Sequence, residues 1–154
     1  MTQSIATSRA GSNYSAADLG ALATLDRHTF RPPGLSFEVE GKVFLNSVLD
    51  LTSAEISLNK LPPGGGMPFH HHHQTNEEIY VFVGGRGEFQ VDGETFDVVE
   101  GSVVRVAPQG VRCWRNTSDQ PLYYIVVQSP ADGYKGKTTI GDGVADAAAV
   151  QWPS

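Results

Sequence analysis

The feature that most constrains the fold is a series of short apolar or β-branched runs, separated by turn residues and with no helical segment between them. The runs extend from LSFEVE, which begins at Leu35, to LYYIVVQ, which ends at Gln128. Asp92-Gly93 lies between two of them and predicts a two-residue hairpin, because a type I′ turn needs positive φ at both central residues. Strands at this spacing predict an all-β fold, an antiparallel sandwich or barrel, instead of βαβ units.

The two ends of the chain differ from this β-rich body. Residues 1–31 form a polar arm in which Ser15 can cap one short helix. Three leucines follow at helical spacing, namely Leu19, Leu22 and Leu25. Residues 131–154 form a weakly patterned tail, with Trp152 as an anchor onto the body. We therefore expect one globular domain over residues 32–130, with a short N-terminal helix before it and the tail packed on it.

Charge and cysteine content argue against several classes of partner. The 154-residue chain has 11 Lys and Arg against 17 Asp and Glu, and its basic residues are scattered. We therefore expect neither nucleic acid nor an anionic membrane surface as a partner. Cys113 is the single cysteine and cannot close an intramolecular disulfide, and no segment approaches the ~18 apolar residues of a membrane span. These features predict a cytoplasmic protein.

Four of the five histidines stand together in PFHHHHQTNEEIYVFVGGRG, from Pro68 to Gly87. The run is internal and continues into a predicted strand, so it is not typical of an affinity tag, and a ligand-free polar loop is the alternative to a metal site. Side chains alternate between faces in an extended segment. The two possible pairs are His70 with His72 and His71 with His73. Either pair, with Glu77 or Glu78 from the next strand, could hold a divalent ion and leave positions open for substrate.

The strand that follows the histidines distinguishes the two glutamates. Glu77 shares its face with three aliphatic residues, Ile79, Val81 and Val83, a set suited to packing between layers. Glu78 shares its face with Tyr80 and Phe82, which suits the wall of a pocket better. This difference favours His71, His73 and Glu78 as the metal ligands. The alternative set of His70, His72 and Glu77 stays open.

The same segment resembles the first motif of the cupin superfamily, which is a glycine, five residues, His-x-His, three or four residues, Glu, six residues and a glycine. Two frames fit this pattern. The later frame contains Gly65, His71, His73, Glu78 and Gly85. The earlier frame contains Gly64, His70, His72, Glu77 and Gly84. Pro68 resembles the family's frequent Pro-x-His and favours the earlier frame, whereas Gly85-Arg86-Gly87 resembles its Gly-x-Gly turn and favours the later one.

The second cupin motif is degraded in GSVVRVAPQGVRCWRN, which begins at Gly101. Cys113 stands where the family has a histidine, and no histidine follows His73, so the family's third imidazole ligand is absent. A thiolate at Cys113 is a candidate fourth ligand. The alternative for Cys113 is a small, buried, apolar side chain.

The resemblance covers roughly residues 40–128 and implies a double-stranded β-helix, the cupin jelly-roll barrel. The chain is similar in particular to small single-domain bacterial cupins of unassigned function. A cupin pocket implies a divalent metal ion such as Fe, Zn, Mn or Ni, and a small anionic or polyhydroxylated substrate for a dioxygenase, decarboxylase or isomerase. The alternative is a noncatalytic small-molecule-binding barrel whose metal is structural or absent.

Further residues complete the expected site. Tyr80 is the candidate catalytic residue, as a hydrogen-bond donor or weak acid. The candidate substrate-pocket residues are Phe82, Arg112 and Trp114. The arm of residues 1–40 is long enough to cover a neighbouring copy, and the small sandwich leaves sheet edges exposed, so we expect a homodimer.

Overall fold

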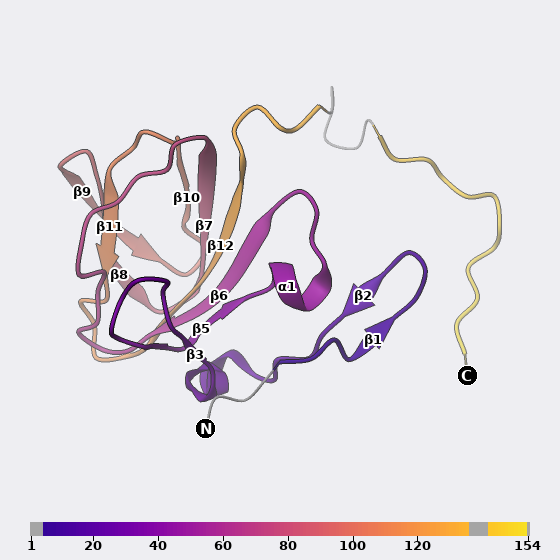
Figure 1. Ribbon diagram of the computed structural model, residues 1–154, viewed down its shortest axis with the longest axis horizontal. Coiled ribbons are helices and arrows are strands. Elements are labelled where there is room, and N and C mark those ends of the chain that lie inside the picture. Colours follow the sequence, from indigo (N-terminus) through magenta and orange to yellow (C-terminus); the bar gives the residue numbers. More distant parts are fainter. Residues whose placement is uncertain (1–4, 136–141, 154) are drawn as a thin grey trace.

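Antiparallel strands dominate the structure, a computed structural model that describes residues 5–135 and 142–153 (Figure 1). The larger sheet has the order β10-β7-β12-β6-β5, and the smaller has the order β11-β8-β9. The larger sheet contains β5 (Lys42–Phe44), β6 (Glu55–Leu61), β7 (Asn76–Gly84), β10 (Val103–Val106) and β12 (Leu122–Pro130). The smaller sheet contains β8 (Arg86–Val91), β9 (Glu94–Val99) and β11 (Arg112–Arg115). The predicted all-β barrel is confirmed.

The N-terminal region contributes shorter elements. These are β1 (Arg9–Ala10), β2 (Ser15–Ala16), the 3-10 helix η1 (Leu22–Arg27), β3 (Thr29–Phe30) and β4 (Val39–Glu40). The helix expected from Ser15 begins only at Leu22. Gly20 interrupts any earlier helix because its φ is +75°, and the Ser15 hydroxyl donates to the Leu49 carbonyl oxygen at 2.6 Å instead of capping a helix.

The run KVFLNSVLDL, residues 42–51, is one of the apolar or β-branched runs that predict strands, but it does not form a single strand. After β5 the chain turns into α1 (Asn46–Leu49). The Glu55 carboxylate explains this turn, because it accepts hydrogen bonds from the backbone nitrogens of Leu45 at 3.1 Å and Asn46 at 2.9 Å. A side chain distant in sequence therefore overrides the local strand preference.

Aromatic side chains fill the space between the two sheets. Tyr80 lies with its ring centroid 4.8 Å from that of Phe89 and 5.0 Å from that of Trp114. Phe89 and Trp114 stack with their ring planes 7° apart. Offset and edge-to-face pairs of this kind add stability beyond the burial of their area. One face of β7 therefore anchors the core, and its orientation fixes every other side chain on that strand.

Two tight turns confirm the glycine signals in the sequence. Asp92 and Gly93 connect β8 to β9 with φ of 50° and 87°, as the type I′ prediction requires. Gly85 connects β7 to β8 with φ of 84°, and a Cβ there would overlap the carbonyl oxygen of Pro121. Gly85 is therefore the glycine that the turn needs, whereas Gly84 has no positive φ. This observation supports the later of the two sequence frames.

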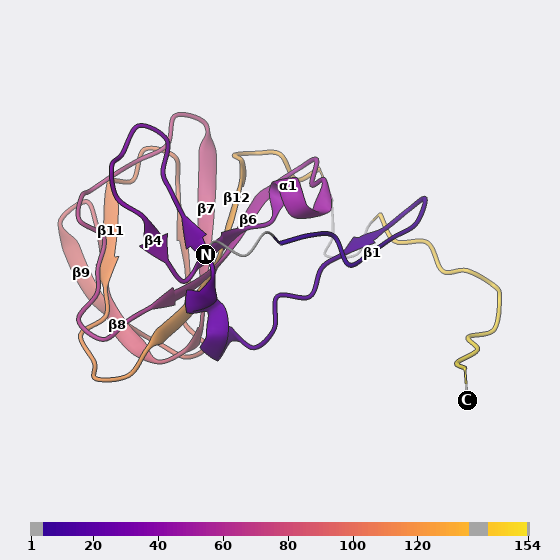
Figure 2. The same ribbon diagram turned by 60° about the horizontal axis from the view of Figure 1, so that its bottom comes forward.

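The described part of the tail runs outward from the barrel in both views (Figures 1 and 2). Its apolar residue Trp152 is 86% exposed, so the described residues do not contain the expected anchoring contact. The predicted division into segments 1–31, 32–130 and 131–154, with the tail packed on the barrel, stays a prediction. None of the described helices has the length and apolar character needed to cross a bilayer.

Candidate metal centre

The structure brings His71, His73 and Glu78 together. One ligand atom from each residue lies within 4.8 Å of the others. The Nε2 atoms of His71 and His73 are 3.7 Å and 3.2 Å from the Glu78 carboxylate oxygens. The two imidazoles are half-buried and Glu78 is buried, so the group opens toward solvent on its histidine side.

Backbone pairing determines which histidines face inward. His71 and Arg112 exchange two backbone hydrogen bonds, at 3.1 Å and 2.9 Å, which form an isolated antiparallel bridge. The His73 nitrogen donates to the Pro108 carbonyl oxygen at 2.9 Å. Because side chains alternate along an extended segment, fixing these two positions turns both imidazoles to the side of Glu78.

Glu78 is held ionised although it is buried. Burial acts to raise its pKa, but the nearby His71 imidazole, the hydrogen bond from Tyr80 and the charges of His73 and Arg112 outweigh it and hold the pKa of Glu78 well below its usual range. The Arg112 Nη2 atom lies 3.0 Å from Glu78 Oε2, and the Tyr80 hydroxyl donates to the same oxygen. Glu78 Oε1 faces His73 and accepts from Gln128 Nε2 at 3.3 Å. Oε1 is therefore the oxygen left to bind an ion.

The spacing of these donors fits a divalent cation. Ligand atoms at about 2.1 Å from an ion and at right angles to each other are about 3.0 Å apart. His73 Nε2 and Glu78 Oε1 are 3.2 Å apart, which is close to this value. All three ligand atoms lie within 4.8 Å of one another, so binding an ion would require side-chain rotation, mainly of His71. Two imidazoles and one carboxylate on one side of an ion form a facial set, which leaves positions for water or substrate.

The alternative set does not come together. His70 and His72 are exposed, and His70 Nε2 lies 2.5 Å from the Gln90 amide oxygen. Glu77 forms a surface ion pair in which both Arg105 Nε and Nη2 lie 2.6 Å from its Oε2. The Glu78 face of β7 turns inward, as the contrast between the two faces predicted. The aliphatic face with Glu77 turns outward instead of packing between the layers, because the aromatic side chains on the Glu78 face fill the core.

Cys113 lies outside the group that includes Glu78. It occupies the β11 face opposite its buried neighbours Arg112 and Trp114, and its Sγ is 3.7 Å from the Gln90 amide oxygen. For the Cys113 thiolate to bind the ion as a fourth ligand, β11 would have to turn its opposite face toward Glu78. The structure instead places this side chain half-buried on the outer side of the barrel.

The ligand group opens into a cavity of about 720 Å³. Trp114 lines this cavity, as expected, together with His71, His73 and Glu78. Two other expected pocket residues differ from the prediction: Phe82 belongs to the aromatic core, and Arg112 is 0% exposed behind Glu78. Tyr80 is also absent from the lining and completely buried, and burial raises its pKa above the usual range. The structure thus places its hydroxyl on Glu78 rather than in the cavity.

Sequence reasoning missed the opposite wall of the cavity. It comes from β5, β6 and the β3–β4 hairpin. The β6 sequence EISLNKL has a polar face of Glu55, Ser57 and Asn59, a pattern usually typical of a solvent-facing side. In the structure this polar face lines the cavity together with Lys42 of β5. The only available signal was the alternation itself, which does not say which face is inside.

Lys42 is expected to lower stability at neutral pH. Burial lowers its pKa to about 8 although the charges of Glu78 and Glu55 act in the opposite direction. Lys42→Met should therefore raise the free energy of unfolding by about 1–3 kcal/mol at pH 7. The unfolded chain keeps this proton up to a pKa near 10.5, so the stability of the wild type should rise with pH between about 8 and 10.5 and approach that of the variant. Urea unfolding of both proteins across this pH range measures the difference, and a difference independent of pH would contradict the prediction.

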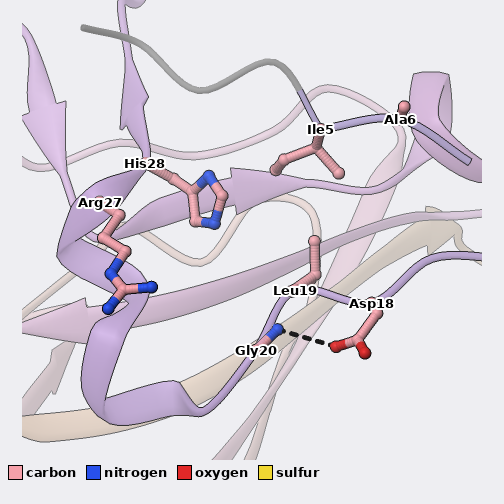
Figure 3. Close-up of a pocket in the computed structure, with 7 residues that line it drawn as sticks. All are labelled: Ile5, Ala6, Asp18, Leu19, Gly20, Arg27 and His28. Atoms are coloured by element: carbon pink, nitrogen blue, oxygen red, sulfur yellow. Dashed lines mark hydrogen bonds between the residues drawn. The ribbon is translucent and has the colours of Figure 1, made fainter. Parts of the chain in front are cut away.

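A second cavity of about 410 Å³ lies by the arm and η1 (Figure 3). Its lining includes Asp18, Arg27 and His28, and Asp18 Oδ1 already accepts a hydrogen bond from the Gly20 nitrogen at 3.0 Å. Within residues 5–135 and 142–153, the only cluster of His, Cys, Asp or Glu side chains that could hold an ion is His71, His73 and Glu78. The larger cavity is therefore the candidate functional site.

Comparisons with known proteins agree with this fold. Residues 57–128 match the family described as Cupin domain. The crystal structure of a cupin protein from Bacteroides fragilis is 37% identical in sequence, with a TM-score of 0.65 over 75% of this chain and 99% of that one. A predicted oxalate decarboxylase from Thermotoga maritima superposes with a TM-score of 0.54 at 24% identity, over 66% of this chain and 91% of that one. At 24% identity, the similarity to the Thermotoga maritima protein shows a shared fold alone.

A curated relative is an uncharacterised protein of Methanocaldococcus jannaschii. It is 32% identical over 68 residues, which are 44% of this chain and 54% of the relative. The chain therefore spans about half the length of this relative.

Proposed function

Because the chain belongs to the cupin superfamily and places two imidazoles and a carboxylate at the wall of a cavity, we propose that it is a divalent-metal-dependent enzyme acting on a small anionic substrate. The proposed ligands are His71, His73 and Glu78. The observation that carries the proposal is the convergence of their ligand atoms within 4.8 Å. Dioxygenase, decarboxylase and isomerase reactions are the proposed reaction types.

The charge around the ligand group supports an anionic substrate. Arg112 already neutralises Glu78, the single carboxylate of the group. A divalent ion held there would act as a Lewis acid that stabilises negative charge on a substrate oxygen. The protein itself supplies the other contributions: Gln128 and Arg112 orient Glu78, and the aromatic wall at Trp114 limits the access of water.

Metal content tests this proposal. Elemental mass spectrometry on tag-free protein, after anaerobic reconstitution with iron or zinc, should give near-stoichiometric metal in the wild type. His71→Ala and His73→Ala should each lower the metal affinity at least about 10-fold to 100-fold, because two donors rarely retain an ion. His72→Ala is the matched control and should bind as the wild type does. Little metal in the wild type would reject the metalloenzyme and favour the noncatalytic binding barrel.

We further propose that the protein is a homodimer. The outer face of the larger sheet carries half-buried aliphatic side chains, which are Ile56, Leu58, Ile79, Val81, Ile125 and Val127. A contiguous apolar sheet face of this kind is typical of an interface. A monomeric mass by light scattering at micromolar concentration would contradict the proposal. The cytoplasmic location stays a prediction, which cell fractionation would test.

A further inference from the structure

A second polar cluster lies in the large cavity, away from the ligand group. It consists of Lys42 on β5 and of Glu55, Ser57 and Asn59 on β6. Strands β12 and β6 separate β5 from β7, which carries Glu78. The cavity therefore has polar groups near two edges of the larger sheet, and apolar side chains such as Phe44, Trp114 and Val126 line the rest of its wall.

Asn59 is fixed so that its carbonyl oxygen faces Lys42. The Asn59 side chain is only 3% exposed. Its Nδ2 donates to the Ser57 carbonyl oxygen at 3.1 Å, to Ser57 Oγ at 3.0 Å and to the Tyr124 carbonyl oxygen at 3.2 Å. Lys42 Nζ donates to Asn59 Oδ1 at 2.7 Å. A buried amide thus holds the ammonium group at the cavity wall.

Lys42 differs from the neighbouring cavity lysine in having no carboxylate in direct contact with its ammonium group. Lys60 Nζ lies 3.0 Å from Asp26 Oδ2 and donates to the Ala23 carbonyl oxygen at 2.6 Å. Within the part of the chain that the structure describes, no carboxylate lies within 4.0 Å of Lys42 Nζ. Lys42 Nζ instead lies 4.8 Å from the centre of the Phe44 ring. The carboxylates of Glu55 and Glu78 act on this half-buried cation only from beyond 4.0 Å, so an anionic ligand group in direct contact with Lys42 would stabilise it further.

We propose that Lys42 and Ser57 form a carboxylate-binding subsite, so that the ligand of this cavity is a small carboxylic acid with an apolar body. The Lys42 ammonium binds the carboxylate, and the Ser57 hydroxyl donates to it because Ser57 Oγ already accepts from Asn59. One cation and one hydroxyl suit a carboxylate better than a phosphate dianion, which presents more charge and more acceptor oxygens. The body of the ligand lies along the aromatic wall, and its other end reaches His71, His73 and Glu78. This last contact rests on the proposed function.

Calorimetric titration of metal-free protein tests the subsite with two probes of nearly equal size and shape, 3-phenylpropionate and 3-phenylpropanamide. The acid should bind about 10-fold to 100-fold more tightly than the amide, because a hydrogen bond to a charged group contributes about 1.5–3 kcal/mol. Lys42→Met should abolish this preference, and Lys42→Arg should retain part of it. Lys60→Met is the matched control, since Lys60 lines the same cavity but is already paired, and it should keep the full preference.

Three outcomes would overturn the subsite: equal affinity of the wild type for acid and amide, an unchanged preference in Lys42→Met, or no binding of either probe at millimolar concentration. The metal content of Lys42→Met separates this proposal from the metalloenzyme and should equal that of the wild type. If the wild type takes up no metal but prefers the acid, and Lys42→Met abolishes that preference, the metalloenzyme alone is rejected and the subsite is supported.

Discussion

Arg112→Met is expected to lower the free energy of unfolding of the metal-free protein by about 3–5 kcal/mol. Arg112 is 0% exposed, and its guanidinium is the only Lys or Arg side chain within 4.0 Å of the Glu78 carboxylate among the described residues. Arg112 Nη1 also donates to the Gly110 carbonyl oxygen at 2.7 Å. Removing the guanidinium leaves the Glu78 carboxylate and the Gly110 carbonyl oxygen in the interior without this partner. Removing one member of a buried ion pair is costly because the remaining charge stays buried and uncompensated.

Urea unfolding at pH 7 measures this effect, and a second variant separates charge from packing. Glu78→Gln removes the carboxylate charge, so Arg112→Met should cost much less in that background than in the wild type. The coupling between the two substitutions should be about 1–3 kcal/mol. A loss below about 1 kcal/mol for Arg112→Met alone would mean that solvent already reaches the Glu78 carboxylate in the folded state.

Gly85→Ala is expected to be similarly damaging, at about 3–5 kcal/mol, for a reason that involves only the backbone. Gly85 has φ of 84°, which costs an alanine about 1–2 kcal/mol, and the new Cβ would overlap the carbonyl oxygen of Pro121. The turn cannot relax freely, because the Gly85 carbonyl oxygen accepts a hydrogen bond from the Glu100 nitrogen at 3.1 Å. We therefore expect β7 to shift relative to β12 in the alanine variant.

Gly93→Ala is the matched control for that turn. Gly93 has a similar φ of 87°, but nothing lies within 4 Å of the position of a Cβ there. Its alanine variant should therefore lose only about 1–2 kcal/mol, the cost of the conformation alone. Thermal or urea unfolding of both variants compares the two costs. Equal losses at the two positions would show that the contact with Pro121 contributes nothing.

The sequence was sufficient to predict the β fold, its hairpin turn and the inward side of β7. Those features depend on local rules: Asp92-Gly93 specifies its own turn, and Tyr80 and Phe82 mark the aromatic side of a strand whose other side is aliphatic. Glu78 follows from the same alternation. The two histidine frames could not be separated by spacing alone, and the backbone pairing of His71 and His73, together with the turn at Gly85, distinguishes them.

The remaining features depend on partners distant in sequence. The fold of α1 requires Glu55, and the position of Lys42 requires the buried amide of Asn59. Neither relation leaves a local pattern. Polar residues such as Ser57 usually mark the outside of a strand, so the sequence alone would assign this face of β6 to solvent. Its burial becomes understandable only when the cavity is known.

The separation of two polar groups within one sheet has an evolutionary consequence. The residues proposed to hold the ion lie on β7 and the loop before it, whereas Lys42, Ser57 and Asn59 lie on β5 and β6 near the opposite edge. Because distant positions usually contribute independently, substitutions on β5 and β6 could alter which molecules the cavity accepts while leaving the ion in place. Selection on a duplicated gene could in this way diversify ligand preference in small steps and keep the inherited chemistry intact.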